Sequence, residues 1–187
     1  MEQFEVTFAG FGGQGIMTAG QLLAYAGMAE GKKVIWLPSY GPEMRGGTAY
    51  CTVVISDERI GSPIINNPKA LCVFNRPSFD KFAPRVKPGG ILIVNSSLIN
   101  VSSDRKDLTQ LLVPANDIAL KAGTPKAANI AVLGAFIGAS EVIPFDTVRK
   151  TVKQKMGAKK DLLEINLKVL QQGYDLARKM LSKKEKV

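Results

Sequence analysis

Residues 4–29 read FEVTFAGFGGQGIMTAGQLLAYAGMA: a short alternating segment, a glycine-rich turn and a longer apolar segment. The alternation over residues 4–9 predicts a β-strand, because the side chains of a strand point to opposite faces in turn. The pattern over residues 16–29 predicts a helix. A second apolar run follows at residues 34–37. Strand, helix and strand in this order are typical of an α/β fold with a mostly parallel sheet.

The rest of the chain continues this pattern and ends in helices. The β-rich residues 48–56 run into a turn at residues 57–59, which predicts an antiparallel excursion at the sheet edge around residues 48–62. Further strands are expected at residues 70–74, 91–94 and 111–113, and further helices at residues 77–86, 117–122, 125–139, 145–156 and 161–184. Because no repeat or long linker interrupts the chain, we expect one domain over residues 1–187 with a helical C-terminal third.

Two of the expected helices carry a packing signal. The apolar residues 127–139 are too few for a membrane span, which needs about 20, and we expect a buried helix with no membrane contact. Gly134 and Gly138 would let another backbone approach it closely. The last helix carries one apolar stripe, formed by Leu163, Leu167, Leu170, Tyr174, Ala177 and Leu181. We expect this stripe to pack on its own domain, with an intersubunit contact as the alternative.

The composition excludes several kinds of catalytic and metal site. The 187 residues include no histidine and only two cysteines, Cys51 and Cys72. A Ser-His-Asp triad, a Cys-His dyad and an imidazole metal site are therefore excluded, and a cluster or tetrathiolate zinc would take about four cysteines. We expect both cysteines to be small buried hydrophobes. The acidic N-terminus and the scarcity of cysteine predict a cytoplasmic protein.

Positive charge is concentrated near the C-terminus. The formal net charge is +9, but residues 1–146 hold 13 basic and 12 acidic residues, whereas residues 147–187 hold 12 basic and 4 acidic ones. The basic part has little aromatic interleaving beyond Tyr174 and no zinc-finger or RNA-recognition motif, so we expect no nucleic-acid partner. A docking surface for acidic partner proteins is favoured, and a solvated helix face is the simpler alternative.

The glycine-rich turn, GFGGQG at residues 10–15, matches Gly-x-Gly-x-x-Gly between a strand and a helix. Such a turn presents backbone amides at a helix N-terminus, where the partial positive charge suits a phosphate or a carboxylate. A NAD site would also need an acid at the end of the second strand, which here ends in Leu37-Pro38-Ser39. The sequence therefore disfavours a nicotinamide cofactor. A turn that only packs the helix against the strand remains an alternative.

A second unusual loop, SYGPEMRGG, occupies residues 39–47. In a parallel sheet it would lie at the carboxyl edge, on the same side as the glycine-rich turn, where α/β folds bind their ligands. Asn75 and Asn95 follow later strands and would line the same edge. Glu43 and Arg45 could pair with each other, contact an acidic ligand or engage another polypeptide, and the sequence leaves these three alternatives open.

These two loops resemble those of the gamma subunit, or gamma domain, of the 2-oxoacid:ferredoxin oxidoreductases. The resemblance rests on GFGGQG at residues 10–15 and SYGPEMRGGT at residues 39–48, with a weaker match from VKPGG at residues 86–90 to residues 95 and 96. It covers most of the chain, up to about residue 140. The segment SYGPE is more similar to the 2-oxoglutarate or branched-chain type than to the pyruvate type.

The resemblance implies a Rossmann-like, three-layer domain in a multi-subunit enzyme. Such an enzyme oxidatively decarboxylates a 2-oxoacid, forms the acyl-CoA and passes electrons to ferredoxin. Its alpha and beta subunits, with a delta subunit as a further partner, would carry thiamine diphosphate and the iron–sulfur clusters. The sequence agrees, because it has neither the Gly-Asp-Gly of a thiamine diphosphate site nor enough cysteines for a cluster. The isolated chain would then be non-catalytic and would shape the active site or its coenzyme A side.

We hypothesise that twelve residues of the two loops and one later strand end line the phosphate or coenzyme A side. They are Gly10, Gly12, Gly13, Gln14, Gly15, Ser39, Tyr40, Glu43, Arg45, Gly46, Gly47 and Asn95. No catalytic residue and no metal ligand is assigned to this chain. The competing interpretations are a free-standing nucleotide-binding or dehydrogenase-like domain and a basic nucleic-acid-binding protein.

Overall fold

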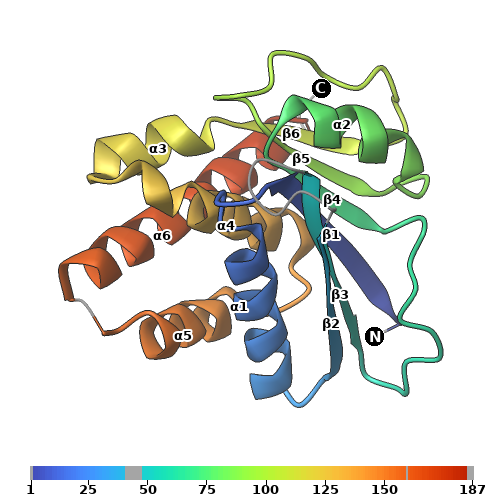
Figure 1. Ribbon diagram of the computed structural model, residues 1–187, viewed down its shortest axis with the longest axis horizontal. Helices are drawn as coiled ribbons and strands as arrows, with labels where there is room; N and C mark the ends of the chain where they lie inside the picture. Colours follow the sequence, from blue (N-terminus) through green and yellow to red (C-terminus); the bar gives the residue numbers. More distant parts are fainter. Residues whose placement is uncertain (1, 41–47, 159, 185–187) are drawn as a thin grey trace.

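The structure, a computed structural model, describes residues 2–40, 48–158 and 160–184. Within them it has a six-stranded sheet in the order β2-β3-β1-β4-β5-β6 (Figure 1). The strands are β1 (Phe4–Phe11), β2 (Lys33–Tyr40), β3 (Thr48–Ser56), β4 (Ala70–Val73), β5 (Ile91–Asn95) and β6 (Thr109–Val113). The helices are α1 (Ile16–Ala29), α2 (Arg76–Phe82), α3 (Ala115–Ala122), α4 (Ala128–Ser140), α5 (Phe145–Lys155) and α6 (Lys160–Lys184), with short 3-10 helices η1 (Ala83–Arg85) and η2 (Pro125–Ala127).

Strand β3 differs from its expected place in the sheet. Strands β1, β4, β5 and β6 run parallel, whereas β3 runs antiparallel to both β1 and β2. The expected antiparallel excursion is confirmed, but it lies one strand inside the sheet, and β2 forms the edge. Residues 51–56 of β3 are all buried, so both faces of this strand are covered. A strand buried on both faces suits a position inside the sheet, which explains why β3 is not at the edge.

Helices cover the two faces of the sheet unequally (Figure 1). One face packs against α1 and α4, with α5 and α6 packed against these helices, and its core includes Phe8, Leu23 and Phe136. The other face holds a smaller core that includes Leu71 and Phe79 of β4 and α2. The predicted α/β fold with a helical C-terminal part is confirmed.

Helix α4 lies at the centre of the larger helical layer. Every residue from Ala128 to Gly138 is buried, as predicted for a helix that is apolar on all sides. Helix α6 crosses it so closely that a Cβ atom at Gly134 would lie 2.2 Å from the carbonyl oxygen of Leu170, and one at Gly138 would lie 2.7 Å from that of Tyr174. The close approach expected at both glycines is confirmed. No helix in the described ranges is both long and apolar enough to cross a membrane.

The apolar stripe of α6 packs on its own domain. Leu170 and Ala177 are fully buried, and Leu167, Tyr174 and Leu181 pack against the same core. The ring of Tyr174 also lies 4.3 Å from that of Phe145 on α5. The stripe therefore holds α6 to its own core, and an intersubunit contact is not needed to explain it.

The two cysteines are expected to be chemically inert in the folded chain, since both are free and buried. Burial raises the pKa of Cys51 to about 12 and raises that of Cys72 well above its usual value. Ellman's reagent at pH 8 should therefore modify neither thiol in the native chain and both in denaturant. Rapid modification of either native thiol would contradict this burial.

Burial of the thiols also predicts a loss of stability at high pH. In the unfolded chain each thiol ionises above about pH 8.5, whereas in the folded chain it stays protonated. The folded state then binds more protons, so the free energy of unfolding falls as pH rises from about 9 to about 12, by about 1.4 kcal/mol per pH unit for each thiol. Urea unfolding of wild type and Cys51→Ala across this range measures the effect, and the variant should lose less. Equal slopes would contradict the assignment.

Candidate functional site

The two loops singled out from the sequence are attached at one edge of the sheet. Gly10 of β1 and Tyr40 of β2 both pair with Ala49 of β3, so β1 and β2 end level with each other on either side of β3. The parallel strands β4 and β5 end at the same edge. This is the carboxyl edge expected from the sequence. Four of the predicted site residues, Glu43, Arg45, Gly46 and Gly47, lie outside the described residues.

The glycine-rich turn leads from β1 into α1 and leaves the start of that helix open. Gly13 and Gly15 have φ angles of 94° and 75°, in the left-handed region that favours glycine. Gly15 is the N-cap of α1, and no described side chain caps the helix. A Cβ atom at Gly15 would lie 2.5 Å from Nδ2 of Asn129, which donates to the Gly15 carbonyl at 3.1 Å. The turn therefore needs glycine for its shape and leaves backbone donors for an anion.

The side chain of Gln14 is held by the chain itself. Its Oε1 accepts hydrogen bonds from the backbone nitrogen of Phe11 at 2.7 Å and from Nδ2 of Asn75 at 3.3 Å. Its Nε2 donates to the carbonyl of Phe74 at 3.3 Å. These bonds tie the end of β1 to the end of β4. Gln14 thus positions the turn, and its predicted contact with a ligand stays a prediction.

Asn95 is a second polar side chain fixed at this edge. It is buried at the end of β5, where its Nδ2 donates to Oδ1 of Asn116 at 2.8 Å. Its Oδ1 accepts a hydrogen bond from the backbone nitrogen of Ala115 at 3.2 Å. Asn95 therefore holds the start of α3 against the carboxyl edge.

A pocket of about 210 Å³ opens beside the glycine-rich turn. The residues around it include Gly13, Gln14, Phe74, Asn95, Asn116 and Lys126. Three of these, Gly13, Gln14 and Asn95, belong to the predicted set, and Asn116 and Lys126 were missed. No sequence signal marks Lys126, which stands between Pro125 and Ala127 at the start of an apolar helix. Among the described residues that line the pocket, Lys126 alone carries a charge.

The other described residues of the predicted set lie elsewhere along the edge. Gly10 is buried in β1, and Gly12 is exposed on the turn. Ser39 pairs with Tyr50 of β3, at the far side of β3 from β1. The structure therefore brings Asn95 to the pocket beside the glycine-rich turn, whereas Ser39 of β2 is not among the described residues that line it.

This pocket offers groups that bind rather than groups that react. Its polar side chains are amides and one ammonium, and they lie next to the open start of α1. In the part of the chain that the structure describes, no group of three or more Cys, Asp or Glu residues is placed to hold a metal ion. Donors of this kind suit an anion such as a phosphate. Because ligand pockets usually measure about 300–1,000 Å³, a hollow of about 210 Å³ would hold one end of a larger molecule.

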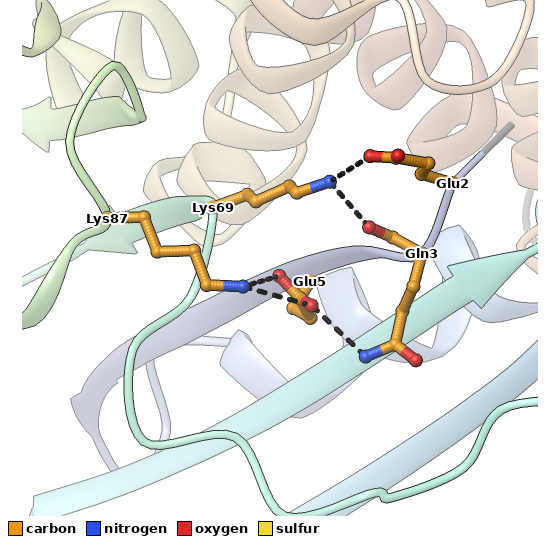
Figure 2. Close-up of polar contacts among 5 residues, drawn as sticks. All are labelled: Glu2, Gln3, Glu5, Lys69 and Lys87. Carbon is orange, nitrogen blue, oxygen red and sulfur yellow. Dashed lines mark hydrogen bonds and ion pairs between the residues drawn. The ribbon is translucent and has the colours of Figure 1, made fainter.

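A larger hollow of about 560 Å³ lies at the opposite, amino edge of the parallel strands, and Figure 2 shows the polar network beside it. The buried carboxylate of Glu5 accepts hydrogen bonds from Nζ of Lys87 at 3.1 and 3.3 Å and from Nε2 of Gln3 at 3.1 Å. Nζ of Lys69 donates to the Gln3 carbonyl at 2.7 Å and lies 3.9 Å from the carboxylate of Glu2. These groups satisfy one another, so we interpret the network as a structural tie between β1 and the starts of β4 and β5.

Lys87→Ala should test this tie, with an expected loss of about 1–2 kcal/mol in the free energy of unfolding. The Glu5 side chain is 4% exposed and, among the described residues, would keep Gln3 as its hydrogen-bond partner. Breaking a fully buried pair costs about 3–5 kcal/mol, but Lys87 is 42% exposed, so water replaces part of the contact. Arg76→Ala is the control, because it breaks an exposed pair with Asp80 and should cost less than about 0.5 kcal/mol. Equal losses in urea unfolding would contradict the structural role.

Comparison with known proteins shows similarity over nearly the whole chain. A family model described as pyruvate ferredoxin/flavodoxin oxidoreductase matches residues 5–176. The chain belongs to this family. The resemblance inferred from the two loops is therefore confirmed.

Within the pyruvate ferredoxin/flavodoxin oxidoreductase family, the chain is similar to proteins of different lengths. It is 42% identical to ketoisovalerate oxidoreductase subunit VorA of Methanothermobacter marburgensis, over 96% of this chain and 37% of that protein. It is 34% identical to 2-oxoglutarate synthase subunit KorC of Methanocaldococcus jannaschii, over 94% of this chain and 95% of that protein. A solved keto/oxoacid ferredoxin oxidoreductase gamma subunit from Geobacter sulfurreducens is 30% identical with a TM-score of 0.81, covering 93% of this chain and 98% of that one. The chain thus has the gamma-type fold and spans about 37% of the length of VorA.

Proposed function

We propose that this chain is the gamma component of a 2-oxoacid:ferredoxin oxidoreductase, in which it shapes the active site or its coenzyme A side. Such an assembly oxidatively decarboxylates a 2-oxoacid to the acyl-CoA and transfers the electrons to ferredoxin. The observation that carries the proposal is the similarity to the Geobacter sulfurreducens gamma subunit over 93% of this chain. Residues 1–187 act as one domain of this assembly in the cytoplasm.

The proposal assigns the redox chemistry to other chains. Thiamine diphosphate and the iron–sulfur clusters belong to the alpha, beta and delta subunits. The residues of this chain do not fit a cluster, because it has two cysteines, both buried, and a cluster takes about four thiolates. The contribution of this chain is therefore to bind a substrate and to exclude water from a site that other subunits complete.

Coenzyme A is the ligand proposed for the pocket beside the glycine-rich turn. Its phosphates would meet the backbone amides at the start of α1 and the ammonium of Lys126. A pocket of about 210 Å³ accommodates only part of so long a molecule, so a partner subunit holds the rest. Glu43 and Arg45, outside the described residues, stay candidates for the same ligand, because Tyr40 and Thr48 on either side of their loop lie at this edge.

The proposed 2-oxoacid is of the 2-oxoglutarate or branched-chain type. Two relatives support this assignment by name, one a ketoisovalerate oxidoreductase subunit and the other a 2-oxoglutarate synthase subunit. The segment SYGPE at residues 39–43 supports it as well. Pyruvate is the comparison substrate in the experiment that follows.

Assembly and turnover test the proposed function together. The chain is purified with its partner subunits, and reduction of ferredoxin or a dye is measured with 2-oxoglutarate, a branched-chain 2-oxoacid and pyruvate. Turnover should require coenzyme A and this chain. Full activity without this chain would contradict the proposal. Micromolar binding of NAD(H) by the isolated chain would favour a free-standing nucleotide-binding domain, and retention on DNA that falls steeply with salt would favour a nucleic-acid-binding protein.

A further inference from the structure

Strand β2 forms an edge of the sheet. It pairs with β3 along its whole length, from Lys33 opposite Ser56 to Tyr40 opposite Ala49. Among the described residues no strand pairs with its other side, and Figure 1 shows β2 at the outside of the sheet near α1. Backbone groups that point away from β3 are therefore available to a further strand, which is one way in which sheets bind extended segments.

An apolar surface adjoins this edge. A shallow hollow of about 590 Å³ is lined by Met28 of α1, Val34 and Ile35 of β2, and Ile60. We call these four residues the β2 shelf. Met28 is 61% exposed, and Tyr25, one helical turn before it, is 44% exposed. Val34, Ile35 and Ile60 are half-buried, so exposed Met28 and these three side chains form a continuous apolar surface beside the edge strand, as on a surface that another protein covers.

Three cations and no described acid complete the lining of this hollow. They are Lys32, Lys33 and Arg59. Lys32 is paired with Asp57, whereas Lys33 and Arg59 form no ion pair within the described ranges. A symmetric dimer would place this same surface on both sides of the contact, and its lining offers no described acid to pair with the cations of a second copy. Acidic side chains beside apolar ones would instead complement the surface.

We infer that β2 and the β2 shelf bind an extended segment of a partner subunit, with apolar side chains flanked by Asp or Glu and a backbone that adds as a further strand. The inference rests on the proposed function, because it requires an assembly. The inference assigns assembly with the partner subunit and binding of the ligand to different surfaces. Substitutions at the β2 shelf should therefore lower the affinity for the partner subunit, and they leave Gly13 and Lys126 at the pocket unchanged.

Two substitutions test this surface in the assembled complex. Met28→Glu places a carboxylate on the apolar shelf, and Lys33→Glu reverses a charge at its rim; both positions are exposed, and thermal unfolding checks that each variant folds. Leu120→Glu on α3 is the matched control, because Leu120 is 64% exposed and Met28 is 61% exposed. Affinity for the partner subunits, measured by biolayer interferometry, should fall about tenfold or more in the first two variants and less than about twofold in the control.

Hydrogen exchange of the wild-type complex tests strand addition without any substitution. Within residues 33–40, the amides that point away from β3 should exchange at least about tenfold more slowly after assembly. Three results would overturn the docking site: unchanged exchange at residues 33–40, unchanged affinity in both variants, or an equal loss of affinity in Leu120→Glu. If the complex still turns over a 2-oxoacid in any of these cases, the proposed function stands. Dimers of the isolated chain that Met28→Glu disrupts would identify a second copy as the occupant and overturn the docking site for a partner subunit too. A wild-type chain that neither assembles nor supports turnover would refute both.

Discussion

Gly134→Ala and Gly173→Ala are each expected to lower the free energy of unfolding by about 1–3 kcal/mol. The two glycines lie where α4 and α6 cross, and a Cβ atom would be 2.2 Å from the Leu170 carbonyl oxygen at Gly134 and 2.1 Å from the Ala131 carbonyl oxygen at Gly173. Both obstacles are backbone atoms, which cannot move unless the helices separate. Alanine at a free helix position would stabilise by about 1 kcal/mol relative to glycine. At Gly134 and Gly173 the steric clash of the added Cβ atom should therefore outweigh the helix preference of alanine, so that the substitution destabilises the chain.

Gly61→Ala is the matched control for these variants. No atom lies within 4 Å of the Cβ position at Gly61, and its φ angle is outside the left-handed region. The change should shift stability by less than about 0.5 kcal/mol or raise it slightly, since it reduces the freedom of the unfolded chain. Urea unfolding compares the three variants with wild type. If Gly134→Ala matched Gly61→Ala, the close crossing of α4 and α6 would be wrong.

Helix positions follow well from the sequence because their signals are local. Helix α1 begins and ends at the predicted residues, Ile16 and Ala29, since Gly15 and Gly31 take left-handed angles on either side of it. Strand β3 was recognised from its β-rich composition, but its place in the sheet was not. That place depends on pairs such as Val6 with Val53, whose partners are far apart in the sequence. Local pattern identifies a strand without naming its neighbours.

The candidate site could be predicted only in part, for a similar reason. The carboxyl-edge rule for parallel strands places the glycine-rich turn and Asn95 together. Lys126 and Asn116 enter the pocket because α3 and α4 dock there, through the hydrogen bond from Asn95 to Asn116 and that from Asn129 to the Gly15 carbonyl. Those contacts join distant segments, and no motif at residues 116–126 indicates them.

Lys126→Glu is expected to raise the KM for coenzyme A of the assembled enzyme by about ten- to hundredfold. Lys126 is the one charged residue among the described lining of the pocket, so the change replaces an attraction for phosphate by a repulsion. Two unit charges 4 Å apart near a protein surface interact by about 4 kcal/mol before screening. Lys126 is exposed, and screening reduces this to about 1.4–2.7 kcal/mol, which is the stated change in affinity.

The rate at saturating coenzyme A separates a binding role for Lys126 from a structural one. If Lys126 binds a phosphate of coenzyme A away from the reacting carbon, kcat should change by less than about twofold, and the rise in KM should shrink at high salt. Lys121→Glu makes the same change of charge on an exposed position of α3 away from the pocket lining and should leave KM within about twofold. A fall in kcat at unchanged KM, or an equal rise in KM for both variants, would contradict coenzyme A binding at this pocket, because neither result requires a phosphate beside Lys126.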